Sequence, residues 1–99
     1  MNDFNVRLNL IECFTDECCC KHIYEREITV TSVNQTINLF NNYTLNIVRV
    51  TDTYFTVLMQ NGVNVFIRNI YTSYPQTCIL PGTNCRQSIT CSGEILSPQ

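Results

Sequence analysis

The sequence predicts an all-β fold, a single small β-sandwich or jelly roll of seven to eight short antiparallel strands. Apolar and polar residues alternate with a period of two through most of the chain, and helical periodicity is hard to find. The alternating runs are short and separated by turn residues at intervals of roughly 8–12 residues. This combination is typical of sandwiches and jelly rolls.

The first predicted strand lies near the N-terminus, at residues 4–10. Its apolar side chains occupy alternate positions: Phe4, Val6, Leu8 and Leu10. A cysteine-rich segment follows it, so we expect an N-terminal arm, residues 1–22, ahead of a β domain, residues 23–99. The strand either folds back into its own sandwich or joins a neighbour's sheet as a donor strand, with alternate side chains filling pockets. The residues alone leave both options open.

The β domain supplies the remaining strands and their turns. In order, the expected strands are residues 28–31, 37–39, 43–50, 53–60, 63–71, 77–80 and 87–91. Asn41-Asn42 and Pro81-Gly82 provide turn signals between them. The strongest hairpin signal is Asn61-Gly62, because both residues tolerate the positive φ of a type I′ turn.

Composition excludes several classes of function. Charged residues make up only 14% of the chain, below the typical ~25%, and the net charge is −2. This balance predicts no nucleic-acid or membrane partner. A single histidine, His22, and scattered acidic residues predict no catalytic site, no cofactor and no small-molecule substrate. The start, Met1-Asn2-Asp3, lacks the features of a secretory signal peptide.

Seven cysteines are the most informative feature of the chain. They are Cys13, Cys18, Cys19, Cys20, Cys78, Cys85 and Cys91. An odd number cannot be fully paired within one molecule, so at least one thiol stays free, binds a ligand or bonds to another chain. Neighbouring side chains of an extended segment point to opposite faces, so the triplet 18–20 cannot reach one site. We interpret the triplet as a covalent connector between subunits, with all seven cysteines as candidates for inter-subunit disulfides.

Three other interpretations of the cysteines remain open, and the simplest is that they are buried free thiols of a cytosolic protein. Cys18, Cys20 and His22 share one face of an extended segment and could act as metal ligands, although the later spacings do not supply the C-x2-C pairs of a structural zinc site. Alternatively, internal disulfides would stabilise a secreted binding module. No signal in the printed sequence directs secretion, so we expect one of two origins for a disulfide-bonded protein of this kind. Either it is oxidised after its cell lyses or releases its contents, or a signal peptide was removed and Met1 was added.

The layout resembles the endospore-appendage subunits of Bacillus-type bacteria, jelly-roll pilins stacked into spore fibres and tied by inter-subunit disulfides. More faintly, Thr77-Cys78-Ile79 and Ile89-Thr90-Cys91 resemble cysteine-rich spore coat and exosporium proteins. The resemblance implies a homopolymer on a spore surface, with no signal peptide. It maps the connector to the triplet 18–20 and the receiving cysteine to Cys91, with Cys78 or Cys85 as alternatives. The triplet in place of a pair, the additional Cys13 and the strand before the connector leave the pairing open.

Overall fold

A computed structural model describes residues 3–15, 21–80 and 86–98. The strands are β1 (Asn5–Thr15), β2 (Lys21–Val30), β3 (Ile37–Asn38), β4 (Thr44–Val50), β5 (Tyr54–Asn61), β6 (Asn64–Tyr71), β7 (Gln76–Leu80) and β8 (Arg86–Ser97). A 3₁₀ turn, η1 (Phe40–Asn42), lies between β3 and β4. The strands form two antiparallel sheets, which we call sheet A (order β2-β1-β8-β7) and sheet B (order β3-β4-β5-β6). The predicted all-β, sandwich-like fold of eight strands is confirmed.

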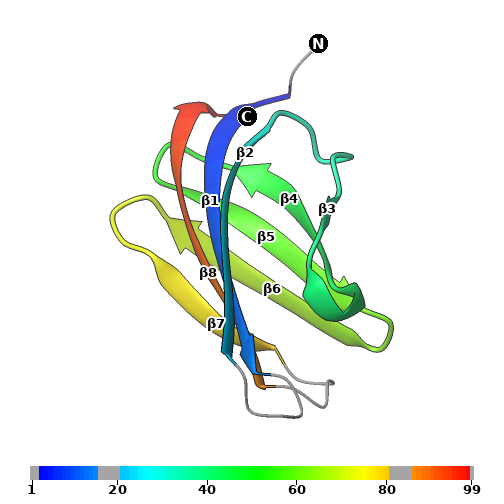
Figure 1. The fold of residues 1–99 in the computed structure, drawn as a ribbon. Coiled ribbons are helices and arrows are strands. Elements are labelled where there is room, and N and C mark those ends of the chain that lie inside the picture. The colour runs from blue at the N-terminus through cyan, green and yellow to red at the C-terminus, as the bar shows by residue number, and fades with distance from the viewer. Residues whose placement is uncertain (1–2, 16–20, 81–85, 99) are drawn as a thin grey trace.

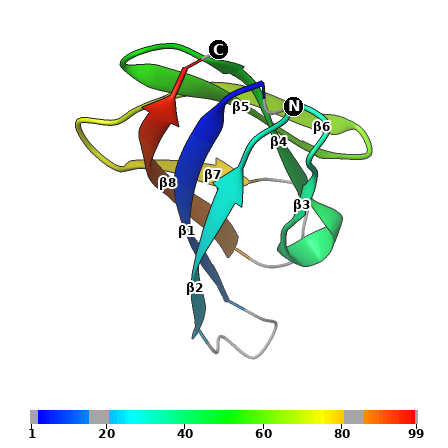
Figure 2. The ribbon, with the colours of Figure 1, turned by 90° about the horizontal axis from the view of Figure 1, so that it is seen from above.

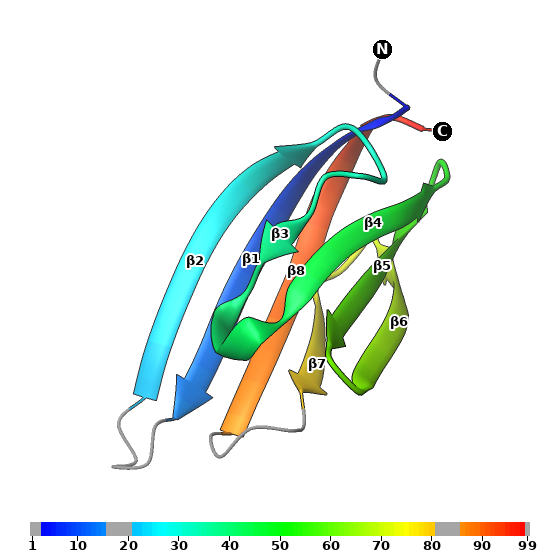
Figure 3. The ribbon, with the colours of Figure 1, turned by 90° about the vertical axis from the view of Figure 1, so that its right-hand side faces the viewer.

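The two sheets pack face to face with the core between them. Figure 3 shows β2, β1 and β8 as one long curved layer and β3 to β6 as the other, and Figures 1 and 2 show that their strands cross at an angle. In β1 the even-numbered side chains from Val6 to Glu12 are buried and the odd-numbered ones are at least partly exposed. Sheet B contributes the facing buried residues Leu45, Ile47, Phe55, Val57, Met59 and Ile70. The sequence alternation is therefore the alternation between core and surface.

One close approach between the sheets depends on a glycine. Gly93 in β8 pairs with Leu8 in β1 and faces the core. A Cβ atom at this position would lie 3.1 Å from the ring of Phe55 in sheet B and 2.7 Å from the carbonyl oxygen of Arg7. The ring can therefore pack directly over the β8 backbone because residue 93 has no side chain.

The described residues do not show the expected separation of an arm, residues 1–22, from a β domain, residues 23–99. β1 lies between β2 and β8, and its pairing with β2 continues to Thr15 and Lys21. The expected boundary at residue 22 falls inside β2, which begins seven residues before the predicted start of residue 28. Its charged residues fit this edge position because they face solvent, as in the ion pair between Arg7 and Glu27 at 3.2 Å.

Two of the three predicted turns lie in the described residues and are present, one of them displaced by one residue. Asn41 and Asn42 both have positive φ, 60° and 65°. In the β5–β6 hairpin, Asn61 pairs with Asn64, so the two central residues are Gly62 and Val63 instead of Asn61 and Gly62. Gly62 has φ 55° and Val63 is not among the positive-φ residues, which fits glycine at the first position of a type II′ turn. The expected Pro81-Gly82 turn lies outside the described residues.

The outer edge of β6 is partly covered by side chains. The side-chain oxygen of Gln76 accepts a hydrogen bond from the Tyr71 backbone N–H at 2.6 Å, and its nitrogen donates to the Asn69 carbonyl at 2.8 Å. Arg68 donates to the carbonyl of Ile67 at 2.9 Å. These bonds occupy main-chain groups that an added strand would need.

Among residues 3–15, 21–80 and 86–98, no helix has the length and apolar character to cross a bilayer.

Candidate functional site

Cys13 is the candidate cysteine that the structure places nearest to solvent. It lies on β1, on the outer face of sheet A, between Ile23 of β2 and Ser88 of β8. Its side chain is partly exposed and its thiol is free. A pocket of about 410 Å³ adjoins it, with Lys21 and Arg86 in its lining. Of the three described cysteines, Cys13 is the one whose side chain is not buried.

Cys78 and Cys91 are sealed inside the sandwich. Both are buried in the core on the inner face of sheet A, Cys91 with 0% exposure. Burial, with smaller contributions from the nearby Cys78 and Glu12, raises the pKa of the Cys91 thiol to about 12. Cys91 therefore stays a neutral thiol at physiological pH, and neither sulfur is presented to another chain. This burial disfavours the receiving role that the resemblance gave to Cys91, with Cys78 as an alternative.

The remaining candidate cysteines, Cys18, Cys19, Cys20 and Cys85, lie outside the described residues. None of the three described cysteines forms a disulfide. His22, the third residue of the metal hypothesis, is described: its ring stacks on Phe14 with a centroid distance of 4.9 Å. In the part of the chain that the structure covers, no group of three His, Cys, Asp or Glu side chains is arranged to hold a metal ion.

The candidate donor-strand residues lie in the chain's own core. Phe4, Val6, Leu8 and Leu10 are all at most 1% exposed. β1 has a pairing strand on each side, β2 and β8, over most of its length. To serve a neighbour, it would have to leave both partners and expose the inner face of sheet A, which makes such an exchange costly.

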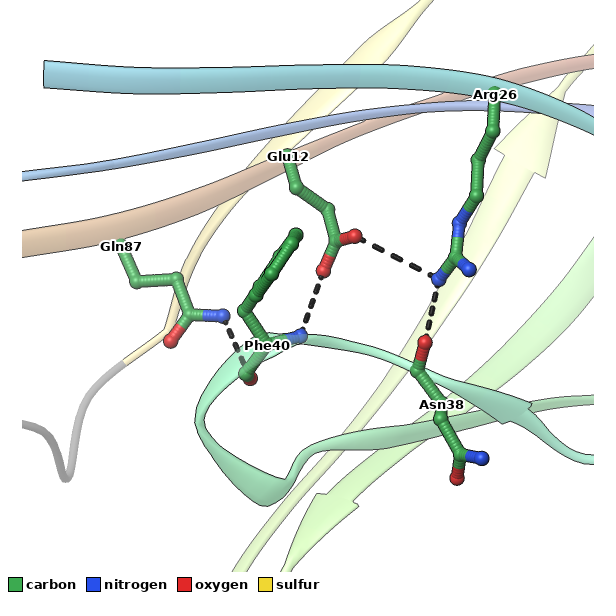
Figure 4. Close-up of polar contacts among 5 residues, drawn as sticks. All are labelled: Glu12, Arg26, Asn38, Phe40 and Gln87. Carbon is green, nitrogen blue, oxygen red and sulfur yellow. Dashed lines mark hydrogen bonds and ion pairs between the residues drawn. The ribbon is translucent and has the colours of Figure 1, made fainter.

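Sequence reasoning did not single out Glu12, which is buried on the inner face of β1 with only 2% exposure. Figure 4 shows its surroundings. Its Oε1 accepts a hydrogen bond from the Phe40 backbone N–H at 2.9 Å, and its Oε2 lies 3.5 Å from a guanidinium nitrogen of Arg26. Arg26 also donates to the carbonyl of Asn38. Burial raises the pKa of the Glu12 carboxyl, and the Phe40 hydrogen bond and the Arg26 charge offset part of that rise.

Gln87 extends this polar cluster from β8. Its side-chain nitrogen donates to the Phe40 carbonyl at 3.0 Å, and its side-chain oxygen accepts from Asn41 at 2.9 Å. Glu12 and Gln87 thus hold both main-chain polar groups of Phe40 (Figure 4). The cluster fastens η1, the segment that leads into β4 of sheet B, onto sheet A. These contacts are all within the chain, and they stabilise the packing of η1 against sheet A.

A pocket lies next to this cluster, and the rings of Tyr24 and Phe40 form part of its lining. The pocket, about 360 Å³, is lined by Tyr24, Phe40, Arg26 and Asn38, among others. The rings of Tyr24 and Phe40 lie 4.6 Å apart, and Phe14 is 5.0 Å from Phe40. These contacts connect the ends of β1 and β2 to η1. They give the side chain of Tyr24, which is exposed on an edge strand, aromatic packing partners.

A second exposed surface lies on the outside of sheet B. The outward side chains of β5 and β6 that form it are Tyr54, Leu58, Val65, Ile67 and Tyr71, and we call this set the β5–β6 face. Val65 and Ile67 are 55% and 60% exposed.

Comparison with protein families, with curated proteins and with solved structures finds no match to this chain.

Proposed function

We propose that this chain is a structural subunit that assembles with copies of itself into a disulfide-crosslinked extracellular fibre or spore-surface layer. The observation that carries the proposal is the position of Cys13. It is a partly exposed thiol in β1, an interior strand of sheet A that pairs with a strand on each side. A sulfur on such a rigid strand has a fixed direction, which suits a repeated bond between identical subunits.

The other described thiols support a division of roles. Cys78 and Cys91 are core residues, so their sulfurs contribute to packing. The proposal assigns the crosslinks to Cys13 and to the triplet 18–20 that follows it in the sequence, with Cys85 as a further candidate. It assigns no catalysis, cofactor, nucleic acid, membrane or small-molecule substrate to the chain.

Low charge supports a partner of the same kind. With 14% charged residues and a net charge of −2, many copies can pack closely without strong mutual repulsion. The outer face of sheet A pairs its own charges, as Arg7 contacts both Glu27 and Glu94 at 3.2 Å. Few uncompensated charges therefore oppose contact between subunits.

Non-reducing electrophoresis of the oxidised protein tests the proposal. We expect a ladder of oligomers that collapses to monomer with reductant, and fibres or sheets by negative-stain microscopy. Replacing Cys13 and the triplet 18–20 together with Ser should abolish the ladder. The matched control is Cys91→Ser, which should alter stability but keep the ladder. A wild-type chain that stays monomeric when oxidised, or a ladder that survives the four-fold replacement, would contradict the proposal.

A further inference from the structure

The pocket beside η1 is built from both halves of the sandwich. Tyr24 and Arg26 of β2 contribute to its lining from sheet A, and Asn38 and Phe40 contribute from the β3–η1 segment that leads into sheet B. Its volume of about 360 Å³ is at the lower end of the range for small-molecule sites, which are concave and combine apolar rings with a few polar groups. A compact ligand of a single ring suits this volume.

The carboxylate of Glu12 lines this pocket and has one oxygen with spare hydrogen-bonding capacity. The side chain is only 3% exposed, and its Oε1 accepts from the Phe40 N–H at 2.9 Å. Within residues 3–15, 21–80 and 86–98, Oε2 contacts Arg26 at 3.5 Å, which is longer than an ordinary N–H···O hydrogen bond. A carboxylate has about four lone-pair sites, so Oε2 can accept a hydrogen bond from a ligand hydroxyl.

The guanidinium of Arg26 supplies donors beside that oxygen. Its side chain is 40% exposed, and its contacts with Glu12 and with the Asn38 carbonyl both use Nη2 (Figure 4). A guanidinium carries five N–H donors in a planar fork, so the donors on Nε and Nη1 remain for a ligand as far as the described part of the chain is concerned. An acceptor and donors side by side can hold two neighbouring hydroxyl groups of one ligand.

Aromatic rings give the pocket an apolar side. Tyr24 is 47% exposed, and its ring lies 4.6 Å from that of Phe40. The face of an aromatic ring is electron-rich, so it attracts positively polarised C–H groups. A sugar ring combines a face of such C–H groups with hydroxyl groups around its rim. Its chemistry therefore matches the rings and the polar pair of this pocket together.

The charges at the pocket favour a neutral ligand. Glu12 and Arg26 carry opposite charges, and Glu25 adds a second carboxylate to the lining. The two carboxylates disfavour an anion such as phosphate, and the guanidinium disfavours an organic cation. The hydrogen bonds of Glu12 and Gln87 to Phe40 hold η1 in place before a ligand arrives, which lowers the cost of binding.

We propose that this pocket binds one neutral sugar ring. Glu12 accepts a hydrogen bond from one ring hydroxyl, Arg26 donates to the neighbouring hydroxyl, and the C–H face of the sugar packs on Tyr24. A single sugar ring has about a dozen non-hydrogen atoms, so the dissociation constant should be about 1–10 mM.

The inference goes beyond the proposed function and does not depend on it. Cys13 lies on the outer face of sheet A, whereas Glu12 lines the pocket from the inner face. Sugar binding and crosslinking through Cys13 therefore use opposite sides of the same strand. Each can be present or absent without the other.

Amide NMR titrations of the nitrogen-15-labelled full chain, in reductant at pH 7, test the pocket. The probes are methyl α-D-glucoside, methyl α-D-galactoside and methyl α-D-mannoside, each added to about 50 mM, which is several times the expected dissociation constant. At least one of them should produce saturable shifts at residues 24–26 and 38–40. Cyclohexanol, a ring without neighbouring hydroxyls, and tetramethylammonium, a cation attracted to aromatic rings, are the comparison probes.

Variants of the lining assign the binding to named side chains. Tyr24→Thr removes the ring and should raise the dissociation constant at least about 3-fold. Arg26→Lys keeps the charge but removes the planar fork, and it should also weaken binding. The matched control is Tyr74→Thr, since Tyr74 is 53% exposed between β6 and β7 and should leave binding unchanged. The amide spectra verify that each variant is folded, and Tyr24→Leu replaces Tyr24→Thr if that variant does not fold.

Saturable shifts that weaken in Tyr24→Thr and Arg26→Lys but not in Tyr74→Thr would support the sugar site. The proposal is overturned if none of the three glycosides shifts residues 24–26 and 38–40, or if Tyr24→Thr binds as tightly as wild type. Equal binding of cyclohexanol would overturn it as well, because the hydroxyl contacts of Glu12 and Arg26 would then contribute nothing. Binding of tetramethylammonium without any glycoside would replace the sugar with a cation.

Discussion

Substitutions at Glu12 can separate the effect of its hydrogen bond from that of its charge. In the wild-type chain the Phe40 N–H donates to Glu12 Oε1 at 2.9 Å. Glu12→Gln keeps a side-chain carbonyl oxygen that can accept this hydrogen bond, but it removes the charge that faces Arg26. Glu12→Ala removes both. We expect the alanine variant to be much less stable at pH 7 and the glutamine variant to remain close to wild type.

The magnitudes follow from the contacts. In Glu12→Ala, the Phe40 N–H loses its acceptor, which costs about 1–3 kcal/mol for a buried donor. The space left by the side chain adds about 1 kcal/mol, giving about 2–4 kcal/mol in total. In Glu12→Gln, the lost ion pair is long and Arg26 is partly exposed, so its loss costs about 0–1 kcal/mol. Removing a buried charge offsets this loss, so the change should stay within about 1 kcal/mol.

The pH dependence provides an independent check of the same reasoning. The Glu12 pKa is raised above its ordinary value of 4.5 in the folded chain, so the native state holds this proton more tightly than the unfolded state. The resulting stability is fully present below pH 4.5 and is lost as pH rises through the folded pKa. Glutamine does not titrate. Wild type should therefore be more stable relative to Glu12→Gln at pH 4 than at pH 7.

Urea unfolding followed by circular dichroism, in reductant at both pH values, measures these differences. Glu94→Gln is the control, since it removes a carboxylate from the exposed pair with Arg7 and should change stability by less than about 1 kcal/mol. The reasoning fails if Glu12→Gln costs as much as Glu12→Ala at pH 7, because the charge would then be the main contribution. It also fails if the difference between wild type and Glu12→Gln does not change with pH.

Three further predictions concern the backbone, the thiols and the first strand. Gly93→Ala should lower the free energy of unfolding by about 1–3 kcal/mol in urea, because its Cβ would lie 2.7 Å from the Arg7 carbonyl oxygen. Gly62→Val should lower it by a similar amount, through the strain of a φ of 55° alone. An unchanged urea midpoint would contradict the steric clash in the first variant or the backbone strain in the second. Iodoacetamide should alkylate Cys13 in the native protein and Cys91 only in urea, as read by peptide mass spectrometry; equal native rates would show that the core does not seal Cys91. Deletion of residues 1–22 removes β1 from the middle of sheet A and should give an aggregated product, whereas a soluble folded monomer would show that the sandwich does not need β1.

The strands of sheet B were predictable because their signals are local. The expected strands at residues 43–50, 53–60 and 63–71 match β4, β5 and β6 to within one residue at each end. Each has alternating apolar residues and a turn signal beside it. Even the displaced turn at Gly62 involves a shift of one residue along the same hairpin.

Sheet A was harder to predict because β2 depends on a non-local partner. Most of its side chains are at least partly exposed on both faces, so the sequence from Lys21 to Glu27 has no alternation to detect. Its extended conformation comes from pairing with β1, and no local pattern specifies that pairing. We predicted an N-terminal arm separate from the β domain because this alternation is missing.

The buried polar residue could have been found from the sequence. Glu12 is in phase with Phe4, Val6, Leu8 and Leu10, so continuing the alternation by one step places it in the core. Its partner, the Phe40 N–H, could not have been predicted, since residue 40 reaches Glu12 only through the packing of η1 against sheet A. Likewise, Cys91 follows Ile89 in phase, but its inward direction is evident only from its position opposite Leu10.

The burial of Cys78 and Cys91 limits which disulfides the chain can make. Seven cysteines can form three disulfides in about 105 ways, since any one of the seven can be left over and the other six pair in about 15 ways. If the sandwich folds first, these two thiols are withdrawn, and the remaining five can form two disulfides in only about 15 ways by the same count. Folding before oxidation thus excludes most of the possible mispaired isomers before the first disulfide forms.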